Sequence, residues 1–253
     1  MPPTRWDVML FVRAAGMALL ALAVALLVTA ATDEGGVSWL GRAGRTLPLA
    51  PLCSALGAWV AIAPTLVRGE VVALQTLGRS PAQIGAAPVA GAALVAVLVA
   101  LAIAAGRAID LTGFFPMVTH PSAWQWRDGV FVDDGRGLEV LSDGALRAAE
   151  VVRQARGTPT IPSLGRASAA VAMACSGVAF PLLVAHAVLG RRARDRSPDT
   201  RTRKWAFAAS VAAAVGSVLL FQAAAARLVP ALAGCLPPLV LLAYAIRKYR
   251  ETE

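Results

Sequence analysis

The chain has 253 residues, of which 57% are apolar and only 15% are charged. Ordinary soluble domains contain about 45–50% apolar and about 25% charged residues, so the composition excludes a single soluble domain and favours a membrane protein. Uncharged apolar stretches of about 20 residues recur along the chain, which also excludes a disordered chain and a secreted protein with one cleaved signal peptide.

The apolar stretches predict six membrane-spanning helices. At about 1.5 Å per residue, each stretch is long enough to cross roughly 30 Å of hydrocarbon. We therefore expect an all-α membrane protein in which three spans, a small external α/β insert and three further spans follow one another. The predicted spans are approximately 14–31, 47–67, 84–106, 167–190, 205–226 and 228–246.

These spans divide the chain into three regions. Residues 1–106 hold the first three spans, residues 107–166 form the insert, and residues 167–253 hold the last three spans with a basic loop at 191–204. In the insert, Trp124–Val132 indicates a hairpin turning at Asp128-Gly129, Leu138–Leu141 a third strand, and Asp143–Arg156 a short helix.

The net charge of +9 is explained by where the basic residues fall. With six spans, the N-terminus, the 68–83 loop, the 191–204 loop and the C-terminus share one side, which holds 14 basic and 6 acidic residues, against 10 and 9 on the other. Because Lys and Arg concentrate in cytoplasmic loops, this side is expected to be cytoplasmic and the 107–166 insert external. The basic character therefore requires no nucleic-acid partner.

The sequence of the 68–83 loop predicts a short helix outside the membrane, over residues 69–78. Glu70 falls in its first turn, where a carboxylate suits the positive end of the helix dipole, and Gly78 stands just past its end. Val71, Leu74 and Leu77 form an apolar stripe, which we expect to face the cytoplasm.

A new helix is predicted to begin directly after this loop. Ser80-Pro81-Ala82-Gln83 has the pattern of a capping box with proline at the first helical position, which starts the third span. A two-turn helix is unstable alone in water, so the 69–78 helix needs a partner surface. That surface is either a groove on a cytoplasmic ATPase or the lipid headgroups.

The same region resembles a known family. The run from Leu47-Pro-Leu-Ala-Pro51 to Leu56-Gly57, then Arg68-Gly-Glu70, Ala73–Gly78 and Ser80, is similar to the second span and coupling helix of LptF/LptG permeases. These are the membrane subunits of the lipopolysaccharide-export ABC transporter. Trp126–Gly129 and Leu228–Pro237 resemble the start of that family's periplasmic domain and its last span.

The resemblance implies a permease half of a lipid exporter in the bacterial inner membrane, with a periplasmic domain reduced from the family's β-jellyroll. Its implied partners are a cytoplasmic ABC ATPase dimer, a second permease copy or paralogue, a lipid substrate and a periplasmic bridge component. The first and fifth spans would form the lateral gate. The residues implied to couple the ATPase to the spans are Arg68, Glu70, Leu74, Gln75, Leu77, Gly78 and Ser80.

Two other functions are possible on the sequence alone: another ABC permease of the FtsX-like type, and a membrane scaffold or regulator that transports nothing. Flanking arginines at Arg42, Arg45 and Arg227 are candidates for contact with lipid phosphates. The chain has no nucleotide-binding loop and no catalytic or metal motif, so we predict that it is not an enzyme and needs no cofactor. Its three cysteines lie in apolar segments and are expected to be packing residues.

Overall fold

The computed structural model describes residues 4–32, 39–105, 124–127, 130–133, 138–141, 143–148, 163–190, 200–226 and 228–251. Within these residues, six helices are long and apolar enough to cross a membrane, as the sequence predicts. Their main helices are α1 (Arg5–Thr32), α3 (Ala50–Val67), α5 (Pro81–Ala105), α7 (Ser163–Leu189), α8 (Thr200–Ala225) and α9 (Leu236–Arg250). The second span begins before α3, at Gly41, and the sixth begins before α9, at Ala231.

Short helical segments join or extend these six. Before α3 come α2 (Trp39–Thr46) and the 3₁₀ turn η1 (Leu47–Leu49), and before α9 comes the 3₁₀ turn η2 (Ala231–Cys235). The helix α4 (Glu70–Thr76) stands between α3 and α5. The helix α2 was not predicted from the sequence, because its two arginines interrupt the apolar run; from Gly41 on it continues into the second span.

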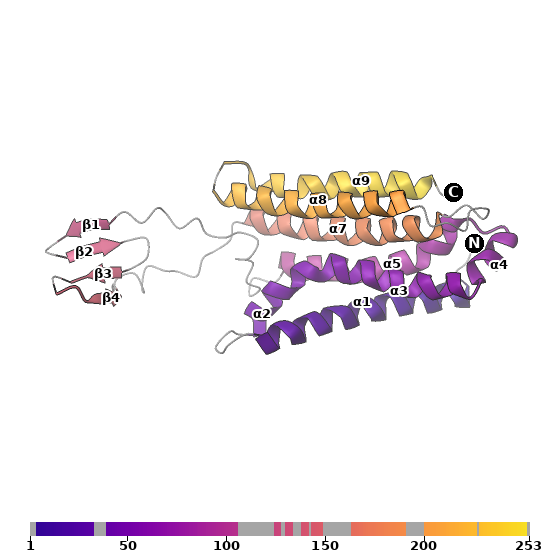
Figure 1. The fold of residues 1–253 in the computed structure, drawn as a ribbon, viewed down its shortest axis with the longest axis horizontal. Coiled ribbons are helices and arrows are strands. Elements are labelled where there is room, and N and C mark those ends of the chain that lie inside the picture. The colour runs from indigo at the N-terminus through magenta and orange to yellow at the C-terminus, as the bar shows by residue number, and fades with distance from the viewer. Residues whose placement is uncertain are drawn as a thin grey trace.

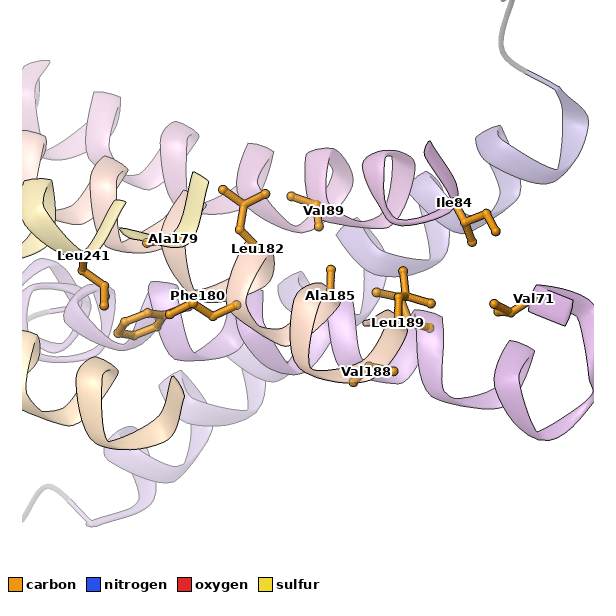
Figure 2. Packing of buried hydrophobic residues seen from close by; sticks show 13 residues of the cluster. Val71, Ile84, Val89, Ala179, Phe180, Leu182, Ala185, Val188, Leu189 and Leu241 are labelled. Atoms are coloured by element: carbon orange, nitrogen blue, oxygen red, sulfur yellow. The ribbon is translucent and has the colours of Figure 1, made fainter. Parts of the chain in front are cut away.

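The six long helices form two groups that match the two halves of the chain. Figure 1 shows α1, α3 and α5 on one side and α7, α8 and α9 on the other. The groups meet mainly where α5 packs along α7, with α3 also against α7. One buried apolar cluster, drawn in Figure 2, joins residues of α3, α4, α5, α7 and α9, so the core lies between the halves.

The outer helices of each group are barely covered by the rest of the chain. Only 11% of the most apolar part of α1 and 6% of that of α8 are buried, against 67% for α7. The apolar side chains of α1 and α8 therefore face outward along most of their length, as membrane lipid or another membrane protein requires.

Glycines mark the places where long helices approach most closely. A Cβ atom added at Gly57 in α3 would lie 2.5 Å from the carbonyl oxygen of Ala14 in α1. An added Cβ at Gly91 would clash with the backbone of Phe11, and one at Gly177 with Ala96. Helix backbones can approach this closely only where a residue has no side chain.

The insert contains a four-stranded antiparallel sheet in the order β1-β2-β3-β4. Its strands are β1 (Trp124–Arg127), β2 (Val130–Asp133), β3 (Leu138–Val140) and β4 (Leu146–Ala148). The predicted hairpin is confirmed, because Arg127 pairs with Val130 across the two-residue connection. Figure 1 shows the sheet beyond the end of the bundle at which α2 lies.

The predicted helix over 143–156 is wrong where the structure describes it. Residues 146–148 form β4, which pairs with β3, and residues 149–162 lie outside the described part of the chain. A turn at Asp143-Gly144 closes this second hairpin. Gly144 has a φ of 82°, and the backbone N–H of Ala145 donates to the Asp143 carboxylate at 2.9 Å.

Candidate functional site

The helix α4 lies at the end of the bundle that also carries both chain termini (Figure 1). It follows α3 through Gly69, whose φ is 74°, and it ends before Gly78, whose φ is 83°. Since left-handed φ values suit glycine, the two glycines allow the sharp turns that set α4 apart from α3 and α5. The predicted helix at 69–78 is thus observed at 70–76, with Gly78 past its end as expected.

The inner side of α4 packs onto the bundle. Val71 is only 2% exposed and belongs to the buried cluster with Ile84 and Leu189 (Figure 2), and Leu74 is partly buried against the same cluster. The expectation that the stripe of Val71, Leu74 and Leu77 faces outward is therefore wrong for Val71. Val71 and Leu74 instead anchor α4 to the bundle, because burying these side chains stabilises a helix too short to be stable alone, whereas Leu77 is exposed as expected.

A second set of residues forms the outward face of α4, which we define as Val72, Ala73, Thr76 and Leu77. All four are exposed, with Val72 at 57% and Leu77 at 79%. Their spacing places them on one side of the helix. This face is the part of α4 that another molecule can reach.

The Glu70 carboxylate bonds within the chain. Its Oε2 accepts a hydrogen bond of 3.2 Å from the indole Nε1–H of Trp6 in the first turn of α1. Its Oε1 lies 3.6 Å from a guanidinium nitrogen of Arg68, whose side chain is 64% exposed. Glu70 therefore connects α4 to α1 through one oxygen and faces an exposed cation with the other.

An ion pair holds the other end of the loop to the same turn of α1. Arg79 donates from Nη2 to Oδ1 of Asp7 at 2.8 Å, and both side chains are largely buried, at 21% and 10% exposure. The Arg79 guanidinium also lies 5.7 Å from the centre of the Trp6 ring, in cation–π geometry. Sequence reasoning missed this pair, since the partners stand 72 positions apart.

Asp7 also caps the start of α1. The backbone N–H of Thr4 donates to Asp7 Oδ2 at 2.9 Å, and the Asp7 N–H donates back to the Thr4 hydroxyl at 3.3 Å. The pattern Thr4-x-x-Asp7 was a readable capping signal, and it explains why α1 begins at Arg5 rather than near residue 14.

The predicted capping box at the start of α5 is confirmed. Ser80 N–H donates to Gln83 Oε1 at 3.1 Å, and Gln83 N–H donates to Ser80 Oγ at 3.2 Å. Ser80 therefore fixes where α5 begins. The last candidate in the loop, Gln75, is partly buried.

The C-terminal end of α9 lies beside this region. Tyr249 donates its hydroxyl hydrogen to the carbonyl of Ala82 in the first turn of α5. Lys248 and Glu251 form an exposed ion pair of 2.7 Å, and the hydrogen bond from Lys248 holds the pKa of Glu251 below its ordinary value. Of the basic loop predicted at 191–204, residues 200–204 are helical within α8, and 191–199 lie outside the described residues.

The arginines predicted to meet lipid phosphates are only partly described. Arg42 and Arg45 belong to α2, at the opposite end of the bundle from α4, and Arg42 stacks 5.0 Å from the Trp39 ring. Arg227 lies outside the described residues. In the same part of the molecule, Arg166 at the start of α7 donates to the Ile103 carbonyl at 3.4 Å.

An apolar groove runs between α3, α7 and α8. It has a volume of about 380 Å³, and its lining includes Leu52, Phe180 and Phe207. A second groove, of about 600 Å³, separates α8 from α9 near Trp205 and Val240. Because α8 is bordered by grooves on two sides, it is the least firmly packed of the long helices.

Neither family models nor curated proteins match this sequence. Among the described residues, no group of three or more His, Cys, Asp or Glu is placed to hold a metal ion. The cysteines Cys53, Cys175 and Cys235 are buried and free, as expected of packing residues.

Proposed function

We propose that the chain is the membrane-embedded permease subunit of an ABC-type lipid exporter. In this proposal α4 is the coupling helix that receives a cytoplasmic ATPase dimer, and a second copy or a paralogue completes the permease. The termini and α4 lie in the cytoplasm, and the sheet of the insert lies outside. The lipid is a lipopolysaccharide-like molecule of the bacterial inner membrane.

The observation that carries the proposal is the pair of opposite faces on α4. One face is anchored in the core through Val71, while the other exposes Val72 and Leu77 at the end of the bundle that carries both termini (Figure 1). An exposed apolar face beside anchored residues suits a protein partner better than water. A helix fixed to the bundle on one side can pass a partner's movement to the spans.

The outer helices support the transport part of the proposal. A lipid must enter between helices from the side, so a permease needs spans that are loosely packed and apolar. The first and fifth spans, α1 and α8, are the two least buried, and α8 is flanked by apolar grooves. These are the spans that form the lateral gate in the family which the sequence resembles.

The test is copurification with a defined activity. The full chain, expressed in its own membranes and purified in mild detergent, should bring down a protein with a nucleotide-binding loop and ATP hydrolysis that vanadate inhibits. Val72→Asp changes the outward face without touching the Glu70 hydrogen bond, and it should reduce capture at least tenfold, since a buried charge at an interface is strongly unfavourable.

Two controls accompany this variant. Glu251→Lys makes a charge reversal at the same end of the bundle, outside the α4 surface, and should leave capture unchanged. Equal loss in both variants, or no hydrolase with the unmodified chain, would reject the exporter and favour the scaffold. A captured ATPase without lipid-stimulated hydrolysis in vesicles would instead favour an FtsX-like permease.

A further inference from the structure

Two side-chain bonds tie the loop that carries α4 to the first turn of α1. At the start of α4, Glu70 accepts from Trp6 at 3.2 Å, and just past its end Arg79 bonds Asp7 at 2.8 Å. Trp6 and Asp7 are neighbours in sequence, and the Trp6 ring also stacks on Arg79. We call these four side chains the α1–α4 clasp.

The clasp holds both ends of α4 rather than one. Glu70 opens the helix, and Arg79 comes directly after the positive-φ residue Gly78. A single contact would leave α4 free to swing about its anchor. With both ends attached, α4 can move relative to α1 only by breaking charge-assisted hydrogen bonds, which are about twice as strong as neutral ones.

The bonds of the clasp are directional and satisfied. The indole of Trp6 has one N–H to give, and it gives it to Glu70. The Asp7 carboxylate accepts from Arg79 and from both the N–H and the hydroxyl of Thr4. A carboxylate with three donors is locked in orientation, so the first turn of α1 offers α4 a rigid attachment point.

The other contacts of α4 are few, which gives the clasp its importance. Val71 is its one buried residue, and the helix is seven residues long. Meanwhile α1 packs closely against α3 and α5 along one side only, near Ala14 and Phe11, and just 11% of its most apolar stretch is buried, so its other side is free of contacts within the described part of the chain. A firm link between a short helix and a loosely covered span transmits movement from one to the other.

We propose that Trp6, Asp7 and Arg79 are positioning residues that make α4 and α1 move as one unit. A displacement of α4 then reaches α1 directly, without passing through α3 and α5. The direction and purpose of that movement rest on the proposed function, in which an ATPase displaces α4. The rigid link between α1 and α4 stands without it.

The experiment measures the distance between α1 and α4 with spin labels. Labels are placed at Val12 in α1, which is exposed, and at Gln75 in α4, which is partly buried and lies outside the outward face, after replacement of the three buried cysteines by serine or alanine. The chain is studied in lipid nanodiscs, alone and with its copurified ATPase in the absence and presence of ATP and vanadate. An intact clasp gives one narrow distance that is the same in every state.

Three variants separate the clasp from simple folding. Trp6→Phe keeps a ring against Arg79 but loses the N–H, so the population of unclasped molecules should rise about tenfold and the distance distribution should broaden. Glu70→Gln removes the charge but keeps an acceptor oxygen, so it should keep the narrow distance. Trp205→Phe makes the same substitution at an exposed tryptophan of α8, outside the clasp, and is the matched control.

The outcomes distinguish this proposal from the exporter assignment. A distance that stays narrow in Trp6→Phe and also in Arg79→Gln would overturn the clasp, whether or not an ATPase is captured. A broadened distance in these variants without any captured ATPase would support the clasp and reject the exporter. With an ATPase present, Trp6→Phe should retain ATPase capture, and its α1–α4 distance should change when ATP is added, because α4 then moves without α1.

Discussion

Asp7→Asn removes the charge that Arg79 faces across a short, largely buried contact, and we expect it to destabilise the protein measurably. Asparagine has nearly the same shape and can still accept from Thr4, so the cap of α1 is largely kept. The change therefore acts mainly on the 2.8 Å bond between Arg79 and Asp7. It leaves the guanidinium in a site that is only 21% exposed, without its counter-charge.

The expected magnitude follows from burial. Breaking a fully buried ion pair on one side costs about 3–5 kcal/mol, whereas a fully exposed pair contributes about 0–1 kcal/mol. Because both partners keep some exposure, we expect a loss of about 2 kcal/mol in the free energy of unfolding. The pair Arg247–Glu251, at 3.6 Å with side chains 81% and 45% exposed, is the natural comparison. Arg247→Gln should change the free energy by about 0.5 kcal/mol or less.

The assay is reversible unfolding in mixed detergent micelles, followed by the helical circular dichroism signal as sodium dodecyl sulfate is titrated. A double-mutant cycle of Asp7→Asn and Arg79→Gln should give a coupling energy of about 1–2 kcal/mol. A coupling energy near zero, or equal losses in Asp7→Asn and Arg247→Gln, would refute the argument that burial strengthens this pair.

Three further predictions use the same unfolding assay. Gly91→Ala places a methyl group against the Phe11 backbone and should lower the free energy of unfolding by about 1–3 kcal/mol. Gly16→Ala, with open space at its Cβ, should be neutral or stabilising. Equal effects of the two substitutions would contradict the close packing of α1 and α5. Ser80→Ala should cost about 1 kcal/mol by removing the cap of α5, and a neutral result would show that the cap contributes nothing. Gly78→Val should lower the free energy of unfolding by about 1–2 kcal/mol, because valine is strained at the positive φ of this residue. Gly78→Asn should have a smaller effect, and the reverse order would contradict the left-handed turn.

The spans were readable from the sequence because hydropathy over some 20 residues is a strong, local signal. The start of α5 was equally readable, since Ser80 and Gln83 carry their capping pattern within four residues. The same kind of signal was overlooked at Thr4 and Asp7. The first span was therefore predicted to begin near residue 14, whereas α1 begins at Arg5. Local capping patterns thus mark where α1 and α5 begin.

The fourth strand was also locally encoded but in conflict with a stronger-looking pattern. The apolar spacing after Asp143 fits a helix, yet Asp143-Gly144 is the same turn dipeptide as Asp128-Gly129, which was read correctly. The turn forms because Gly144 can adopt a positive φ, and the turn then places Leu146 opposite Val140 of β3. Pairing with an existing strand therefore outweighs helix propensity here.

The orientation of α4 could not be read from the sequence at all. Periodicity identifies an apolar stripe, but it does not say whether the stripe meets the chain's own core or a partner. Val71 is buried because α5 and α7 supply a cluster at that position, and α7 is remote in sequence. The Asp7–Arg79 pair is equally remote, so only the fold brings it together.

These contacts change how a substitution of Glu70 must be interpreted. Reversing its charge alters two things at once, because Oε2 holds the Trp6 indole while Oε1 faces exposed Arg68 at 3.6 Å. The bond to Trp6 is short enough to hold α4 in place. The contact with Arg68 is long and exposed, so a partner's cation can replace it at little cost.

Loss of ATPase capture in Glu70→Lys therefore does not by itself assign this residue to docking. Trp6→Phe breaks the first interaction and leaves the carboxylate free for the second, so comparing the two variants separates holding α4 from binding a partner.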